Sequence, residues 1–209
     1  MSASHTALQP DSATFAPQPG DALIVVDVQR DFLPGGALGV PGGDRVVPRL
    51  NRYIARFDEC GLPVIFTRDW HPPDHCSFRQ AGGPWPPHCI AGSAGAAFAP
   101  GLAVPAAAHI VSKAATPEAD AYSGFQGTGL EALLHGLGCR RLFVGGLATD
   151  YCVRATVLDA LAAGFSTVLL ADAVRAVDVH PGDGKRAEQE MAAAGARPLS
   201  FERRRGARP

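Results

Sequence analysis

The sequence predicts an α/β fold in which a parallel sheet carries helices on both of its faces. Short runs of apolar and β-branched residues alternate along the chain with segments of helical periodicity. This alternation is typical of strands that are buried on both faces of a sheet. Glycines directly follow three of the helical segments, at positions where helices commonly end.

The expected elements follow one another in strand and helix order. The main strands read LIVVDV, PVIFTR, HIVSK, RLFVG and TVLLA, and each is apolar or β-branched almost throughout. They lie at residues 23–28, 63–68, 109–113, 141–145 and 167–171, with a short last strand near 197–201. The expected helices lie at 44–60, 129–137, 151–163 and 184–194, and the first three end at Gly61, Gly138 and Gly164.

The chain has 209 residues, which is enough for one domain with a sizeable core. We expect residues 21–201 to form that domain. Residues 1–20 lack apolar periodicity and are predicted to be a flexible arm, and the arginine-rich residues 202–209 a basic tail. Residues 70–107 also lack periodicity, and a loop of this length inside a domain is usually functional or disordered.

The composition excludes several classes of protein. Nineteen basic residues balance 20 acidic ones, which argues against bulk attraction to nucleic acid. No apolar run reaches about 18 residues, and the N-terminus lacks the features of a secretory signal, so we expect no membrane partner. Five scattered cysteines do not suggest a disulfide framework, which favours a reducing, cytoplasmic setting.

Four reactive side chains fall at the predicted carboxyl ends of strands. Asp27 lies near the end of the first strand, Asp69 follows the second, Lys113 ends the third and Cys152 comes after the fourth. Open parallel sheets bind their ligands beyond these strand ends. Lys113 is one of only two lysines among 19 basic residues. The sequence therefore predicts that two carboxylates, an ammonium and a thiol meet at one edge of the sheet.

Cys152 has the surroundings of a nucleophile. The predicted helix begins beside it, and the positive end of a helix dipole favours a thiolate. Lys113 would lower the pKa of the thiol further, and Asp27 could accept its proton. The alternative interpretation is that Cys152 is an ordinary buried core thiol.

The loop after the second strand has the residues of a metal site. Asp69 and His71 point to the same side of an extended segment, and His88 can return to them across a proline-stiffened loop. Two imidazoles and one carboxylate make an open site for a divalent metal, with His75 or Ser77 as further candidate ligands. The alternative is a proline-rich surface loop with exposed histidines.

Several separated motifs resemble the nicotinamidase/pyrazinamidase family of the isochorismatase-like cysteine hydrolases. The resemblance covers about residues 21–200. It rests on Ala22-Leu-Ile-Val-Val-Asp-Val-Gln29 with Asp31-Phe32, on Thr67-Arg-Asp-Trp-His71, on Trp85-Pro-Pro-His-Cys89, on Lys113 with Tyr122-Ser-Gly-Phe125, and on Gly145-Gly-Leu-Ala-Thr-Asp-Tyr-Cys-Val153.

The resemblance implies a three-layer, Rossmann-like α/β fold with a central parallel sheet flanked by helices. It implies Cys152 as the nucleophile, Asp27 as the proton shuttle and Lys113 as the cation of a catalytic triad. It also implies a cis peptide between Leu147 and Ala148, with the amides of Ala148 and Cys152 forming an oxyanion hole. The implied reaction converts nicotinamide to nicotinate and ammonia through a thioester, with pyrazinamide as a further substrate.

For binding, the resemblance implies that Asp69, His71 and His88 hold the metal. Zinc is expected first, with iron and manganese as alternatives. Phe32, Trp85 and Tyr122 would form an aromatic slot for a pyridine ring. The family is also compatible with a homodimer.

Three other functions fit parts of the same sequence. A metal-independent relative would act on a different small amide or carbamoyl substrate. A non-haem iron oxygenase would use the two histidines and one carboxylate, but it would leave the cysteine, lysine and aspartate without a role. A catalytically silent binding module is the third alternative.

Overall fold

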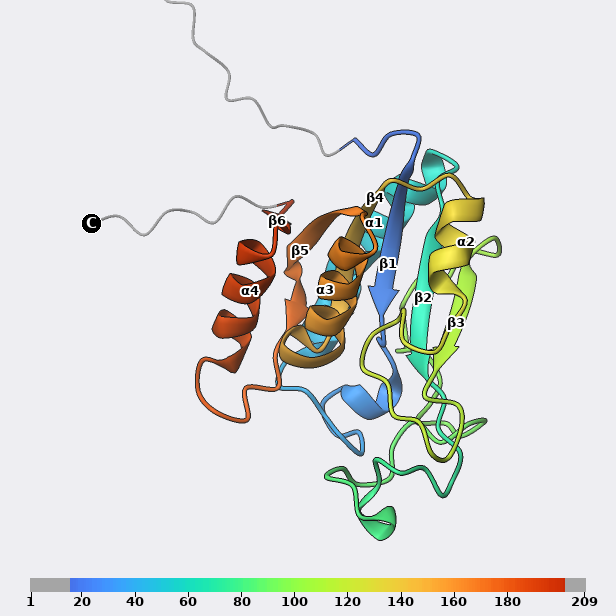
Figure 1. Ribbon diagram of the computed structural model, residues 1–209, viewed down its shortest axis with the longest axis vertical. Coiled ribbons are helices and arrows are strands. Elements are labelled where there is room, and N and C mark those ends of the chain that lie inside the picture. Colours follow the sequence, from blue (N-terminus) through green and yellow to red (C-terminus); the bar gives the residue numbers. More distant parts are fainter. Residues whose placement is uncertain (1–15, 202–209) are drawn as a thin grey trace, which may run out of the picture.

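A computed structural model describes residues 16–201 and shows six parallel strands in one sheet (Figure 1). The strand order is β3-β2-β1-β4-β5-β6. All five neighbouring pairs are parallel. The predicted parallel α/β fold is therefore confirmed. The strands are β1 (Asp21–Val26), β2 (Val64–Asp69), β3 (His109–Lys113), β4 (Arg141–Leu147), β5 (Ser166–Arg175) and β6 (Arg197–Leu199).

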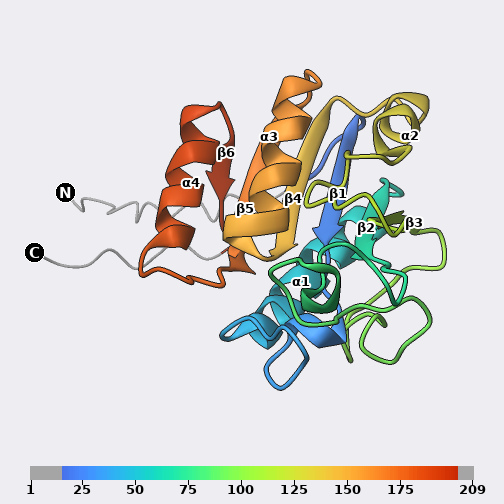
Figure 2. The ribbon, with the colours of Figure 1, turned by 60° about the horizontal axis from the view of Figure 1, so that its bottom comes forward.

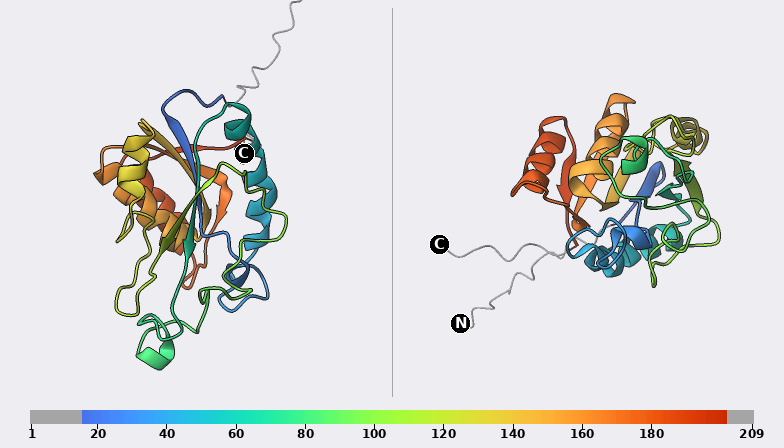
Figure 3. Two further views of the ribbon diagram at one scale, coloured as in Figure 1. Left: turned by 90° about the vertical axis from the view of Figure 1, so that its right-hand side faces the viewer. Right: turned by 90° about the horizontal axis from the view of Figure 1, so that it is seen from below.

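Helices cover both faces of this sheet and make three layers (Figure 3). One face carries α1 (Val46–Glu59), and the other carries α2 (Leu130–Gly136), α3 (Arg154–Ala162) and α4 (Asp183–Ala193). Each face has its own hydrophobic core. The residues of β1 alternate between them, because successive side chains of a strand point to opposite faces: Leu23 and Val25 pack in the core beneath α1, and Ala22, Ile24 and Val26 pack in the other.

Two elements differ from the sequence prediction in ways that matter for the site. The helix expected at 151–163 is preceded by a π-helical turn, Thr149–Val153, and α3 begins only after it. Strand β5 continues to Arg175, four residues beyond its expected end at 171, across an irregularity in its pairing with β4. Periodicity could not reveal either feature, since both depend on pairing with neighbouring elements.

Much of the long loop at 70–107 lies beyond the carboxyl ends of the strands, and its last residues return to the amino end of β3 (Figures 1 and 2). The 3-10 turn Arg79–Ala81 is its one helical element, and isolated bridges such as that between His71 and Ile90 fasten it. Two further 3-10 turns, Arg30–Phe32 and Gly43–Arg45, lie between β1 and α1. The loop is therefore held in place by backbone hydrogen bonds to itself and to the sheet.

The predicted arm and tail fall mostly outside the described residues, which exclude 1–15 and 202–209. Within the predicted arm, the Gly20 carbonyl accepts hydrogen bonds from the amides of Arg140 and Arg141, at 2.7 and 3.1 Å. Among residues 16–201, no helix combines the length and the apolar character needed to cross a bilayer.

The strand order reverses between β1 and β4, and this reversal positions the candidate site. On an open parallel sheet, connections leave in opposite directions at such a point and open a crevice beyond the strand ends. Asp27 directly follows β1, and the turn that carries Cys152 follows β4. Asp69 is the last residue of β2, the neighbour of β1, and Lys113 is the last residue of β3, the next strand along.

Candidate active site

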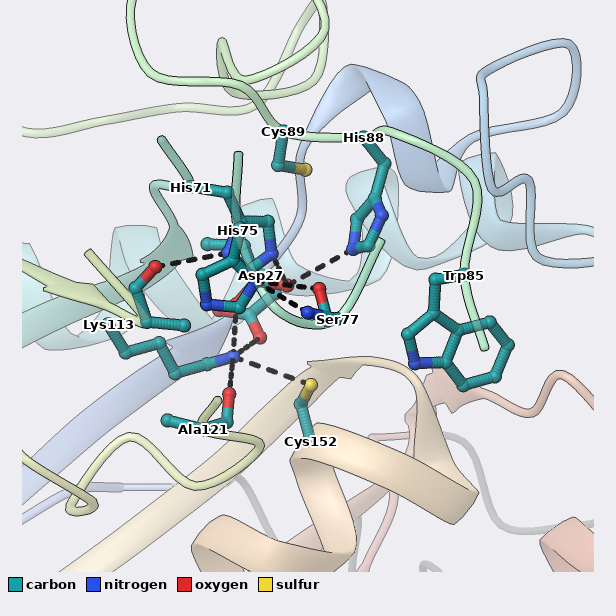
Figure 4. Close-up of polar contacts among 12 residues, drawn as sticks. Asp27, His71, His75, Ser77, Trp85, His88, Cys89, Lys113, Ala121 and Cys152 are labelled. Carbon is teal, nitrogen blue, oxygen red and sulfur yellow. Dashed lines mark hydrogen bonds and ion pairs between the residues drawn. The ribbon is translucent and has the colours of Figure 1, made fainter. Parts of the chain in front are cut away.

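Lys113 stands at the centre of the predicted cluster, with its side chain fully buried (Figure 4). Its Nζ lies 3.0 Å from Asp27 Oδ2, 3.6 Å from Cys152 Sγ and 3.0 Å from the Ala121 carbonyl oxygen, and it also contacts Asp69 Oδ1. The structure thus brings together all four residues that the sequence placed at strand ends. The ligand atoms of the two carboxylates and the thiol lie within 4.8 Å of one another, and the Lys113 ammonium is the cation among them.

Asp27 is held by its backbone and by one hydroxyl group. Its φ of 47° turns the chain as it leaves β1, and its amide bonds to the Thr67 carbonyl at 3.2 Å. The Thr67 hydroxyl donates to Asp27 Oδ1 at 2.7 Å. Burial raises the pKa of this carboxyl group and outweighs the opposing effect of the Lys113 ammonium. A carboxylate with a raised pKa is a stronger base than a solvated one, which suits a proton acceptor.

Cys152 differs from the sequence expectation of a stabilised thiolate. Burial raises the pKa of its thiol well above the ordinary value, and the nearby Lys113 ammonium only partly opposes this effect. The residue also lies within the π-helical turn and not in the first turn of α3. Lys113 therefore has the lowering effect on the thiol pKa that the sequence predicted, but burial outweighs it. Sulfur attacks as the thiolate, so this thiol needs a nearby base before it can act as a nucleophile.

Asp69, His71 and His88 form a second buried cluster next to the first. His71 Nε2 lies 3.5 Å and His88 Nε2 4.0 Å from Asp69 Oδ2. Burial alone would raise the pKa of Asp69, but the charges and hydrogen bonds of Lys113 and His71 lower it below its ordinary range. Asp69 therefore faces Lys113 with one carboxylate oxygen and the two imidazoles with the other. It connects the two clusters directly.

The contacts of both imidazoles suit a metal ligand. His71 Nδ1 lies 3.1 Å from the Ala114 carbonyl and His88 Nδ1 2.8 Å from the Pro86 carbonyl. Since a carbonyl only accepts, Nδ1 of each ring is the donor, and Nε2 on the side of Asp69 is the atom that could bind a metal ion. His71 Nε2 is buried and has no hydrogen-bond partner among the described residues. Burial lowers the pKa of His88, which keeps this ring neutral. The three residues fit a divalent metal ion.

His75 and Ser77, the further candidate ligands, bond to each other. The Ser77 hydroxyl lies 2.7 Å from His75 Nδ1, and His75 Nε2 lies 3.2 Å from the Ala119 carbonyl. Both nitrogens of His75 are thus engaged, and neither faces Asp69. Ser77 lines the pocket beside the cluster.

One pocket is lined by residues of both clusters, among them Asp69, His71 and Cys152. Phe32, Trp85 and Tyr122, which the family resemblance implies as an aromatic slot, line it, and Trp85 Nε1 donates to the Tyr122 hydroxyl at 3.0 Å. Ala148 and Cys152, the predicted oxyanion residues, also line it, and the expected cis peptide joins Leu147 to Ala148.

The sequence analysis missed several residues of this pocket. Tyr151 packs edge-on against Trp85, with 5.4 Å between ring centroids, and completes an aromatic wall. Its position directly before Cys152 was a signal that could have revealed it. Four further residues line the pocket from loops or irregular segments that carry no sequence signal: Leu38, Val40, Asp120 and Val177.

Known proteins resemble the chain in sequence and in structure. The family model described as the isochorismatase domain matches residues 21–203. The nicotinamidase of Escherichia coli (strain K12) is 41% identical over 199 residues, covering 85% of this chain and 93% of that protein. The pyrazinamidase of Pyrococcus horikoshii, solved in complex with zinc, is 51% identical with a TM-score of 0.84, covering 88% of this chain and 100% of that one. The PnC1 protein of L. infantum, solved in complex with nicotinate, is 41% identical with a TM-score of 0.81. The match covers 88% of this chain and 94% of that one.

Proposed function

Since the chain belongs to the isochorismatase family, we propose that its buried Cys152, Asp27 and Lys113 carry out amide hydrolysis through a thioester. The protein is an amidohydrolase with nicotinamidase function, converting nicotinamide to nicotinate and ammonia. The observation that carries the assignment of the triad is the position of Lys113 Nζ, 3.0 Å from Asp27 and 3.6 Å from Cys152.

In the first half-reaction Asp27 accepts the proton of the Cys152 thiol, and the sulfur attacks the carboxamide carbon. The backbone amides of Ala148 and Cys152 donate to the oxyanion that forms, and loss of one such donor typically costs about 3 kcal/mol of transition-state stabilisation. Asp27 then gives its proton to the leaving nitrogen. Ammonia departs and a thioester remains on Cys152.

In the second half-reaction water hydrolyses the thioester. Asp27 accepts a proton from the attacking water and returns it to the departing sulfur, so the thiol is regenerated, and the acid that leaves ionises to nicotinate. Throughout both steps the Lys113 ammonium keeps its contacts with Asp27 and with the sulfur, so it stabilises negative charge on either group.

Asp69, His71 and His88 would hold a divalent metal ion at the other end of the pocket. We propose zinc, as in the solved P. horikoshii relative, with iron and manganese as the alternatives. A bound ion would supply a Lewis acid there for the ring nitrogen of the substrate or for a water molecule.

The aromatic side chains of the pocket would orient the substrate ring between these two ends. Phe32, Trp85 and Tyr122 suit a flat heteroaromatic ring, and Tyr151 extends this wall. Pyrazinamide has the same carboxamide on a similar ring, so we propose it as a second substrate. The homodimer is a further proposal, which light scattering on the purified protein would measure.

The decisive experiment measures ammonia release from nicotinamide by the purified protein, before and after chelation and again after zinc is restored. We expect release that chelation removes and zinc restores. Release that chelation does not change would contradict the metal's role but keep the cysteine mechanism. No release under any condition would contradict the proposed substrate.

A further inference from the structure

The segment that leaves β1 carries two polar residues that the proposed mechanism does not use, Gln29 and Asp31. They follow Asp27 at alternate positions, and each contacts the backbone of the metal cluster. We propose that Gln29 and Asp31 are positioning residues that hold the metal-binding side chains in place and so set the metal affinity. This inference rests on the metal centre proposed above.

Gln29 pairs with the backbone of Asp69 at two points. Its Nε2 donates to the Asp69 carbonyl at 2.8 Å, and its Oε1 accepts from the Asp69 amide at 2.8 Å. The same Nε2 donates to the Ala96 carbonyl at 3.0 Å. The side chain is fully buried, so water cannot replace these bonds. A pairing on both sides of one residue fixes the position and the rotation of that residue, and here the residue is a metal ligand.

Asp31 acts in the same way on the peptide group that follows His88. Its Oδ2 accepts from the Cys89 amide at 2.8 Å. Cys89 has a φ of 46°, a left-handed conformation that is uncommon for residues other than glycine and needs support from its surroundings. The Cys89 carbonyl in turn accepts from the His71 amide at 3.0 Å. Through the two peptide groups of one residue, Cys89, Asp31 therefore supports the backbone of both histidines.

The close packing around Asp31 shows that its position is tightly defined. The Asp31 amide bonds to the Gly95 carbonyl at 3.1 Å. A Cβ atom added to Gly95 would lie 2.1 Å from Asp31 Oδ2, so only glycine leaves room for this carboxylate. Gln29 also forms a bridge with Phe98, which fastens the segment to the same stretch of the long loop. The segment 27–31 therefore carries the proposed base and also supports all three metal ligands.

Residues that orient metal ligands typically change metal affinity about 10- to 100-fold when they are replaced. Gln29→Met keeps the length of the side chain but leaves both backbone groups of Asp69 without their partner. Asp31→Ala removes the acceptor for the Cys89 amide, whereas Asp31→Asn keeps one carbonyl oxygen that can accept the same bond. The matched control is Arg30→Gln, because Arg30 lies between the two and its side chain is exposed.

The test measures the zinc dissociation constant of the full chain by competition with a chromophoric chelator, alongside thermal unfolding of the metal-free protein. We expect Gln29→Met and Asp31→Ala to weaken zinc binding about 10- to 100-fold. Asp31→Asn and Arg30→Gln should bind zinc as the parent does. A merely structural role would lower the unfolding temperature of the metal-free protein and leave the dissociation constant unchanged.

Parent-like zinc binding by folded Gln29→Met and Asp31→Ala would overturn the inference. If Gln29→Met does not fold, the comparison of Asp31→Ala with Asp31→Asn still tests the inference. Equal zinc affinities of these two variants would overturn it. Failure of the parent to bind zinc would contradict the proposed metal centre, which is a different result from equal binding by parent and variants.

Discussion

Replacing Lys113 by methionine tests whether one buried ammonium stabilises both the fold and the triad. Methionine has a similar length and no charge. The change removes the cation that lies 3.0 Å from Asp27 Oδ2 and contacts Asp69 Oδ1, and it leaves two buried carboxyl groups without a cation between them. The Ala121 carbonyl also loses its donor, 3.0 Å away.

The expected cost follows from this geometry. Removing one partner of a buried ion pair typically lowers the free energy of unfolding by about 3–5 kcal/mol. A domain of this size shifts its Tm by about 2–4 °C per kcal/mol, so we expect a fall of roughly 6–20 °C. The deficit should be largest at neutral pH. In the parent, Lys113 lowers the pKa of Asp69 below the unfolded value, and the resulting stability is present above about pH 4 and is lost as the pH falls through the folded pKa.

The assay is urea unfolding of both proteins at neutral and at acidic pH, with ammonia release as a second readout. Lys185→Met is the matched control, because Lys185 is the other lysine of the chain and is exposed on α4. We expect the control to match the parent and Lys113→Met to lose turnover. A Lys113→Met variant within about 1 kcal/mol of the parent at neutral pH would refute the reasoning, since an exposed pair costs no more than that.

Three further predictions test the triad and the pocket. Cys152→Ala should abolish ammonia release and keep the parental circular dichroism, and retention of even about a tenth of the activity would contradict a thioester route. Thr67→Val removes a hydrogen bond that lowers the pKa of Asp27. Since Asp27 must be ionised to accept the proton, the acid side of the pH profile of kcat/KM should shift to higher pH by roughly 0.5–1 unit. An unchanged profile would argue against Asp27 as the base. Trp85→Phe removes the hydrogen bond from Trp85 to the Tyr122 hydroxyl and should raise KM about fivefold with little change in kcat. A loss confined to kcat would instead place Trp85 in the chemical step.

The sequence predicted the sheet because strands buried on both faces have a pattern of their own. β3 has the predicted bounds, His109–Lys113, and the other strands differ at their ends only. Burial patterns do not record where pairing stops, so β5 was predicted too short. The π-helical turn around Cys152 has the composition of an ordinary helix start, and no periodicity distinguishes the two.

The sequence also placed Asp27, Asp69, Lys113 and Cys152 at strand ends, which on a parallel sheet was enough to predict their meeting. It could not predict the direction in which the pKa of Cys152 shifts, because that depends on burial and on charges from other strands, and here burial outweighs the effect of Lys113.

By itself, then, the sequence determined the layers of the fold, the edge of the sheet that carries the chemistry, and the residue types available there. All of these follow from local patterns and from the direction of parallel strands. Only the tertiary structure decided that Asp69 faces Lys113 and the imidazoles at once, and that Gln29 pairs with the backbone of Asp69. The contacts of Asp69 with Gln29 and with Lys113 join residues 40 and 44 positions apart, at distances set by the packing of β2 between β1 and β3. Hydrogen bonds and ion pairs form only between atoms a few ångströms apart. The sequence therefore does not give their partners, which are known only once the strands are assembled.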